Sequence, residues 1–240
     1  MDSLYAPSAS TYAALTWSPQ AGGLFAGRNN RALYTIVKGV GEQIFYDFAN
    51  SNDRNIRIRA LDADDAGNLW VGGSNTVAFY RVAPDKSVIT VPYTGSVLAI
   101  EARSDAIYVS ALEGTTNKIL RFPLSGTTVG APQTTLDVSA ALPGVQVNAL
   151  AFAANGDLFL GTNRPTNPIL QLRAGQTAPE TLYTGLLVSD TNPGATGVVG
   201  LSWGTGNLLH AAGVEIVADP KSITALGDVI RINTLRAGEH

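Results

Sequence analysis

The stretch VNALAFAANGDLFLG, residues 147–161, contains the pattern that decides the fold. It reads as an apolar strand, a turn with Asn155, Gly156 and Asp157, and a second apolar strand. Asn-Gly pairs tolerate the positive φ angles that tight hairpins require. Strands that are almost continuously apolar are typical of sheets buried on both faces. The stretch therefore predicts a buried β-hairpin.

This hairpin pattern recurs along the 240 residues at intervals of about 40 to 50 residues. The other four copies are YAALTWSPQAGGLFAG (12–27), IRALDADDAGNLWVG (58–72), VLAIEARSDAIYVS (97–110) and VVGLSWGTGNLLHA (198–211). A third strand of one common pattern follows each copy, at residues 32–37, 78–83, 119–124, 169–174 and 229–234. A weaker fourth strand follows the first four copies, at residues 43–49, 87–93, 132–138 and 179–185.

The fifth copy has no fourth strand of its own before His240. The missing strand has a counterpart at the other end of the chain, because DSLY (2–5) resembles ETLY (180–183) in the fourth strand of the fourth copy. It stands directly before the first copy, where an outer strand belongs. We therefore expect residues 2–6 to complete the last sheet.

Repeated units of four antiparallel strands at this spacing are typical of a β-propeller. The sequence predicts an all-β, single-domain, five-bladed β-propeller of four-stranded antiparallel blades, whose last blade is completed by the N-terminal strand. The expected blades are about 11–50, 56–94, 96–138, 146–186 and 197–235 plus 2–6. Part of a six-bladed ring is the alternative.

Composition narrows the classes of partner. The formal net charge is −3, so we expect no binding to nucleic acid. No window approaches about 18 consecutive apolar residues, so we expect no membrane insertion. The chain has no cysteine, which excludes disulfides and thiolate chemistry. With so few lysines and no cysteine, we expect a monomer that is secreted or periplasmic, in the cell envelope.

The phrase NALAFAANGDLFLG (148–161) resembles the repeats of NHL and SMP-30/gluconolactonase-like propellers, and is similar to virginiamycin B lyase-type repeats. The resemblance implies a β-propeller fold. It does not imply one function, because these propellers include lactonases, lyases and binding modules. It also implies, for SMP-30-like enzymes, a divalent-metal site of Glu, Asn and Asp side chains at the channel mouth. The matching positions here are Ala13, Arg59, Leu98, Asn148 and Val199, of which only Asn148 is a suitable ligand. We therefore expect no metal, no other cofactor and no catalytic residue.

Arginines gather on one expected face, where the second-to-third and fourth-to-first strand connections meet. They are Arg28, Arg31, Arg54, Arg57, Arg59 and Arg164. Guanidinium groups suit carboxylate or phosphate ligands. The alternative is that they are solvated or paired with Asp53, Glu113, Asp190 or Glu215.

Three further features are candidates. Asn148 and Asn163 lie on the same face of one copy. They could bind sugar hydroxyls or a cation, and the alternative is that they form hydrogen bonds within turns. Residues 214–227 read as a long loop that carries Glu215 and Asp219, typical of a lid or of a cover over apolar side chains. His210 stands where we align Ala26, Val71, Val109 and Leu160, and is a candidate general base or a core residue.

These observations favour a non-catalytic binding or scaffolding propeller, whose partner is a small molecule, a glycan or a protein. The expected ligand-binding residues are Arg59, Asn148, Asn163, Arg164, Glu215 and Asp219. The alternative is a metal-dependent hydrolase, lactonase or lyase of the SMP-30 or virginiamycin-lyase kind, with a metal held by Asn148 and by Glu215 or Asp219.

Overall fold

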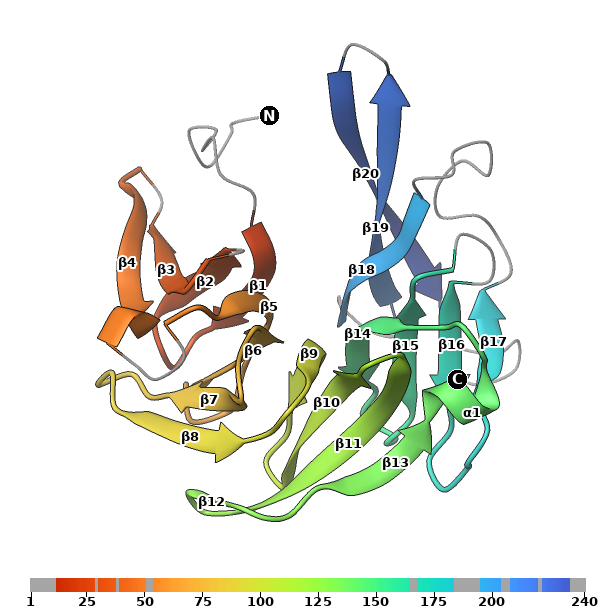
Figure 1. Ribbon diagram of the computed structural model, residues 1–240, viewed down its shortest axis with the longest axis horizontal. Coiled ribbons are helices and arrows are strands. Elements are labelled where there is room, and N and C mark those ends of the chain that lie inside the picture. Colours follow the sequence, from red (N-terminus) through yellow and green to blue (C-terminus); the bar gives the residue numbers. More distant parts are fainter. Residues whose placement is uncertain are drawn as a thin grey trace. The chain divides into compact units, whose positions relative to one another are not determined.

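The computed structural model describes residues 12–28, 30–37, 39–50, 54–164, 168–183, 195–203, 208–219 and 222–233. Antiparallel strands dominate these ranges and form five sheets that follow one another along the chain (Figure 1). The chain divides into two compact units, residues 1–135 and 136–240. The helices within the described ranges have three and four residues, and none is long enough to cross a membrane.

The first unit contains three blades, in which successive strands pair with one another. Blade one consists of β1 (Tyr12–Ser18), β2 (Gly23–Arg28), β3 (Ala32–Val37) and β4 (Gly41–Asp47), followed by the 3-10 helix η1 (Phe48–Asn50). Blade two consists of β5 (Arg57–Ala63), β6 (Leu69–Ser74), β7 (Ala78–Val82) and β8 (Val88–Pro92). Blade three consists of β9 (Ser96–Ala102), β10 (Ala106–Glu113), β11 (Thr116–Ser125) and β13 (Gln133–Asp137), and the short β12 (Thr128–Val129) also pairs with β11.

The second unit begins with the end of β13 and the short helix α1 (Val138–Ala141), whose N-cap is Asp137. Blade four consists of β14 (Val147–Phe152), β15 (Leu158–Thr162), β16 (Ile169–Leu172) and β17 (Glu180–Tyr183). Blade five consists of β18 (Ala195–Trp203), β19 (Leu208–Asp219) and β20 (Ser222–Asn233). The four-stranded pattern predicted for the first four copies is confirmed, whereas the proposed outer strand at 2–6 lies outside the described residues.

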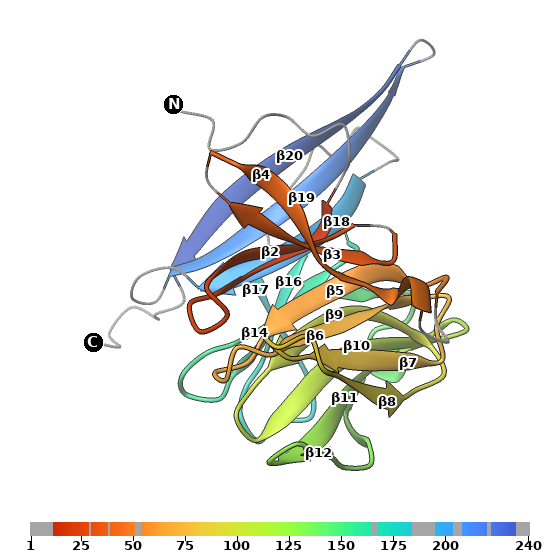
Figure 2. The ribbon, with the colours of Figure 1, turned by 90° about the vertical axis from the view of Figure 1, so that its left-hand side faces the viewer.

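The prediction of a long loop at 214–227 is wrong. β19 and β20 continue as a hairpin whose pairs run from Val214 and Gly227 to Asp219 and Ser222 (Figure 2). The sequence on each side, VEIVAD and SITALG, is rich in β-branched residues, which favours strands.

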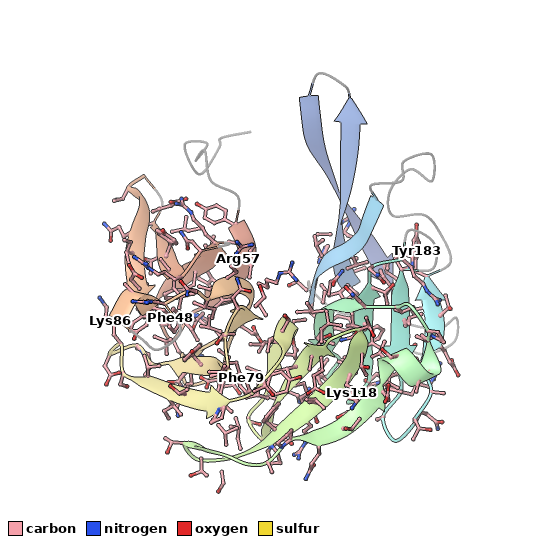
Figure 3. All side chains as sticks on the ribbon, in the orientation of Figure 1. Phe48, Arg57, Phe79, Lys86, Lys118 and Tyr183 are labelled. Carbon is pink, nitrogen blue, oxygen red and sulfur yellow. The ribbon has the colours of Figure 1, made fainter. Side chains whose placement is uncertain are left out.

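The core of each unit lies between neighbouring blades. Phe79 of blade two, which is labelled in Figure 3, contacts Phe122 of blade three, with ring centroids 4.9 Å apart. Phe48 packs against Tyr80 between blades one and two. In the second unit, Phe159 of blade four meets Trp203 of blade five edge-on at 5.3 Å. These aromatic pairs stabilise the blade-to-blade contacts beyond the area that they bury.

Glycines near the end of the second strand of blades one, two and four permit close approach of the next blade. A Cβ on Gly72 would lie 2.7 Å from the Cβ of Val97, and one on Gly161 would lie 2.9 Å from the Cβ of Val198. Gly27 meets Ile58 in the same way. Glycine is therefore required at these positions by packing, not by a special φ angle.

In blades two, three and four, a polar side chain on the third strand contacts a residue at the turn between the first and second strands. Arg81 donates to Asn68 at 3.1 Å, and Gln171 donates to Asp157 at 2.7 Å. In blade three, the Arg121 guanidinium beside Asp105 lowers the pKa of that carboxyl group. These bonds fix the hairpin turn to the rest of the blade.

The carboxylate of Asp62 joins the three inner strands of the first unit. It accepts from the Thr16 hydroxyl on β1 at 3.2 Å and from the Ala102 N–H on β9 at 2.7 Å. Desolvation raises the pKa of Asp62 to about 6, and the neighbouring Asp64 adds to the rise, although the hydrogen bonds from Ala102, Ala63 and Thr16 oppose it.

Candidate functional site: an arginine cleft on the first unit

Asn30 organises the turn between β2 and β3. Its Oδ1 accepts from the Ala32 N–H at 3.0 Å, and its Nδ2 donates to the Tyr34 hydroxyl at 3.4 Å. Its backbone carbonyl accepts from the Ile58 N–H of blade two at 3.3 Å. One asparagine thus fixes its own turn and places the start of the next blade beside it, which is typical of Asx chemistry in turns.

The connection from blade one to blade two is anchored at both ends. The Phe48 N–H donates to the Arg31 carbonyl at 3.1 Å, and the Phe48 side chain is fully buried. At the other end, Ile56 and Ile58 are buried while Arg57 between them is exposed. The alternation of buried and exposed residues directs the Arg57 side chain away from the core.

These two connections enclose a cleft of about 500 Å³, which we call the arginine cleft. Its lining consists of Asn30, Arg31, Ala32, Tyr34, Ile44, Asp47, Arg54, Asn55, Ile56 and Arg57. Arg57, labelled in Figure 3, begins β5. The face predicted to carry ligands therefore does bring its second-to-third and fourth-to-first connections together within the first unit.

The cleft carries an excess of positive charge. Arg31 is paired through Nε with Oδ1 of Asp47 at 3.0 Å. Arg54 and Arg57 are exposed, and neither guanidinium forms a hydrogen bond or ion pair with any residue in the described ranges. Two guanidinium groups are thus available for a planar anionic group such as a carboxylate or phosphate.

Arg28 stands behind the cleft rather than in it. It forms an ion pair with Glu42, which also accepts from the Tyr12 hydroxyl. Its Cζ lies 4.4 Å from the centroid of the Tyr34 ring and 5.7 Å from that of Tyr12. The guanidinium therefore supports the Tyr34 ring by a cation–π contact.

The carboxylates proposed as alternative partners of the arginines do not have that role where the structure describes them. Arg28 and Arg31 pair with Glu42 and Asp47 instead. Glu113 accepts from the Tyr93 hydroxyl at 3.0 Å, and burial raises the pKa of that tyrosine. Asp53 and Asp190 lie outside the described residues.

The six predicted ligand-binding residues are divided between the two units, with Arg59 in the first and the other five in the second. Arg59 is exposed on β5, two residues beyond Arg57, and does not line the arginine cleft. Asn163 accepts from the Gln146 N–H through Oδ1 at 2.9 Å, which is the turn-forming role. The Arg164 N–H donates to the Thr162 hydroxyl at 3.3 Å. Glu215 and Asp219 lie on β19, where the side chains are outside the described part of the structure.

Every innermost strand has a β-bulge at the same place. The ladder skips one residue in each, namely Ala13, Arg59, Leu98, Asn148 and Val199. These are the positions that the resemblance to SMP-30-like enzymes associates with metal ligands. Their chemistry, one amide, one guanidinium and three apolar side chains, does not fit a divalent cation. The described residues contain no group of three or more His, Asp or Glu side chains that could hold a metal.

The alignment of His210 with Ala26 is wrong by one residue. Leu15 pairs with Ala26 and Leu201 pairs with Ala211, so Ala211 is the equivalent residue. His210 corresponds instead to Phe25 on the other face of the blade and is partly exposed. A shift of one residue along a strand exchanges its faces, so the argument for a buried general base no longer holds.

Comparison with known proteins supports the fold and leaves the activity open. No protein-family model and no curated protein matches the chain. Among solved structures, a gluconolactonase from Xanthomonas campestris is similar with a TM-score of 0.62 and 12% identity, over 79% of this chain and 65% of that protein. The virginiamycin B lyase of Staphylococcus aureus is similar with a TM-score of 0.59 and 16% identity, over 88% of this chain and 68% of that protein. An auxiliary nutrient binding protein from Bacteroides thetaiotaomicron is similar with a TM-score of 0.57 and 11% identity, over 83% of this chain and 55% of that protein.

The chain is therefore an all-β, five-bladed β-propeller whose blades mostly have four antiparallel strands. The resemblance to gluconolactonase-like and virginiamycin B lyase-like propellers is confirmed at the level of fold. The chain spans about two thirds or less of the length of these three proteins. Since the similar structures include both enzymes and a binding protein, their likeness does not select a function.

Proposed function

We propose that this protein is a non-catalytic binding propeller that binds a small anion, with a carboxylate or phosphate group, in the arginine cleft. The observation that carries the proposal is the pair of exposed guanidinium groups, Arg54 and Arg57, in a concave site. Among the described residues that line it, the one carboxylate is Asp47, which is paired with Arg31. The protein as a whole is acidic, so a local positive site would attract anions selectively.

The proposal is tested by titrating the protein with inorganic phosphate at low ionic strength and following binding by calorimetry and NMR. We expect Arg54→Gln and Arg57→Gln each to weaken binding by about tenfold, since each removes a charge-assisted hydrogen bond. Added salt should weaken binding to the unaltered protein as well. Arg173→Gln removes the same charge from the second unit and should leave the affinity unchanged.

Arg59→Gln locates the ligand. Arg59 lies on the same strand as Arg57. Its guanidinium likewise forms no hydrogen bond or ion pair with a described residue, but it does not line the cleft. If Arg59→Gln weakens phosphate binding and Arg57→Gln does not, the ligand lies beside the inner-strand bulge and the assignment to the arginine cleft is wrong. Absence of phosphate binding to the unaltered protein would contradict anion binding altogether.

We also propose that residues 2–6 complete blade five as its outer strand. The similarity of DSLY (2–5) to ETLY (180–183) supports this, since β17 at 180–183 is the outer strand of blade four. Within the described residues, blade five ends at β20 without a fourth strand. An unpaired strand of this length would otherwise be an exposed edge.

A further inference from the structure

The lining of the arginine cleft contains an apolar part as well as a charged part. Tyr34 on β3 and Ile44 on β4 are directly opposite in the sheet register, and both line the cleft. Side chains paired in this way lie next to each other on one face of a sheet. Ile44 is 60% exposed, so the cleft presents an apolar surface that no described residue of the first unit covers.

The charged part of the lining comes from another segment. Arg54 and Asn55 belong to the connection into blade two, Arg57 begins β5, and all three are exposed. The two parts are held in place independently, the first by the β3–β4 ladder and the second by the buried Ile56 and Ile58. A ligand in the cleft can therefore meet a guanidinium pair and an apolar surface at the same time.

Tyr34 is fixed before any ligand arrives. The Arg28 guanidinium lies over its ring at 4.4 Å, and Asn30 donates to its hydroxyl. Arg28 is itself held by the ion pair with Glu42. A side chain that is already ordered loses little conformational entropy on binding, so Tyr34 offers a preorganised contact for an apolar group.

We infer that the ligand of the arginine cleft is an amphipathic anion, in which a phosphate, phosphonate or carboxylate group is attached to an aromatic or similarly compact apolar group. The inference rests on the proposed function and adds the ligand class to it. The anionic group binds Arg54 and Arg57, and the apolar group covers Ile44 and the Tyr34 ring. Removing that apolar surface from water strengthens binding relative to a bare anion.

The experiment compares three probes: phenylphosphonate, which has both groups, inorganic phosphate, which lacks the ring, and benzyl alcohol, which lacks the charge. Calorimetry should show phenylphosphonate binding about tenfold more tightly than phosphate. Benzyl alcohol should bind more weakly than phenylphosphonate by at least the same factor. Arg57→Gln should weaken binding of both anions.

Ile44→Thr separates the apolar contribution from the charge. It should weaken phenylphosphonate binding about fivefold and leave phosphate binding unchanged, since threonine keeps the β-branched shape but offers less apolar surface. Val40→Thr is the matched control, because Val40 is 64% exposed and outside the cleft lining. Circular dichroism of both variants checks that they fold.

The outcomes distinguish the two proposals. If phosphate and phenylphosphonate bind equally well, or if Ile44→Thr leaves the phenylphosphonate affinity unchanged, the inference is wrong while anion binding stands. If neither anion binds, or if Arg54→Gln and Arg57→Gln have no effect on either, the proposed function itself fails. Equal weakening by Val40→Thr would show that the effect of Ile44→Thr is not local.

Discussion

Gly72 controls how closely blades two and three approach each other. A methyl group there would contact the Cγ1 of Val97 and lie 2.7 Å from its Cβ. We expect Gly72→Ala to lower the free energy of unfolding by about 1–3 kcal/mol, because the inner strand of blade three must move away. Urea unfolding measures the change. Gly23→Ala is the control, since nothing lies within 4 Å of a Cβ at that position, and equal stability of the two variants would contradict the packing argument.

Asp62 makes the stability of the first unit depend on pH. Its pKa is about 6 in the folded chain and 3.8 in the absence of structure, so the folded chain holds the proton more tightly. Its contribution to the free energy of unfolding is therefore largest below pH 4 and decreases as the pH rises towards 6 and above, by about 3 kcal/mol.

Asp62→Asn should remove this dependence, since the amide oxygen can still accept from Ala102 and no charge is buried. Urea unfolding at pH 4 and pH 7 should show the variant gaining stability relative to the unaltered protein as the pH rises. Asp65→Asn, at an exposed neighbouring aspartate, should show no such gain. A stability difference between Asp62→Asn and the unaltered protein that is the same at both pH values would show that Asp62 does not titrate in this range.

Single residues were also the scale at which sequence reasoning was least reliable. Arg28 and Arg31 pair with Glu42 and Asp47 of β4, within the same predicted blade, whereas the predicted partners were acids more distant in the sequence. His210 was displaced by one position because alignment of short apolar runs does not fix their register. Both errors concern side-chain direction, which depends on the bulge and register of each strand.

At the scale of elements, the β19–β20 hairpin extends beyond the sheet to which it belongs. Within the described residues, β18 pairs with β19 only as far as Glu215, and the pairs from Ile216 onward join β19 and β20 alone. A two-stranded ribbon without a third strand is marginally stable. We expect replacement of residues 216–225 by Asn-Gly to change the melting temperature by less than about 4 °C.

Circular dichroism melting of the shortened protein tests this expectation. A matched control replaces Ser202 on β18 by proline, which removes a ladder donor inside the blade and should lower the melting temperature clearly. A large decrease on shortening the hairpin would mean that the extension stabilises the protein through contacts beyond its own ladder.

The elements themselves were predictable wherever local patterns determine them. Apolar hairpins with turn residues between them gave the first two strands of every blade, because periodicity and turn chemistry are local. Residues 214–227 form strands although they do not alternate regularly between apolar and polar residues, so their β-branched residues were the one local signal for a hairpin. The arginine cleft was predicted only as a gathering of arginines, since the placing of Tyr34 and Ile44 beside them depends on packing between blades.

At the scale of the whole molecule, the sequence repeat predicts five blades. It also predicts that the N-terminal residues 2–6 complete the fifth blade, and a deletion can test this. Deleting residues 1–10 should lower the melting temperature by more than about 5 °C, because blade five would lose its proposed outer strand and expose β20 as an edge. Deleting residues 236–240 removes chain beyond the predicted blades and should have little effect. An unchanged melting temperature after the N-terminal deletion would mean that residues 2–6 are not the closing strand.

The bulge shared by all five inner strands also makes this chain a scaffold for engineering. A bulged residue is outside the hydrogen-bonded ladder, so its side chain can change without altering the pairing of its neighbours. Ala13, Arg59 and Val199 are exposed, and Asn148 is partly exposed. Randomising these four codons together would produce a combinatorial library with an unaltered strand framework. New specificities could then be selected from it by surface display.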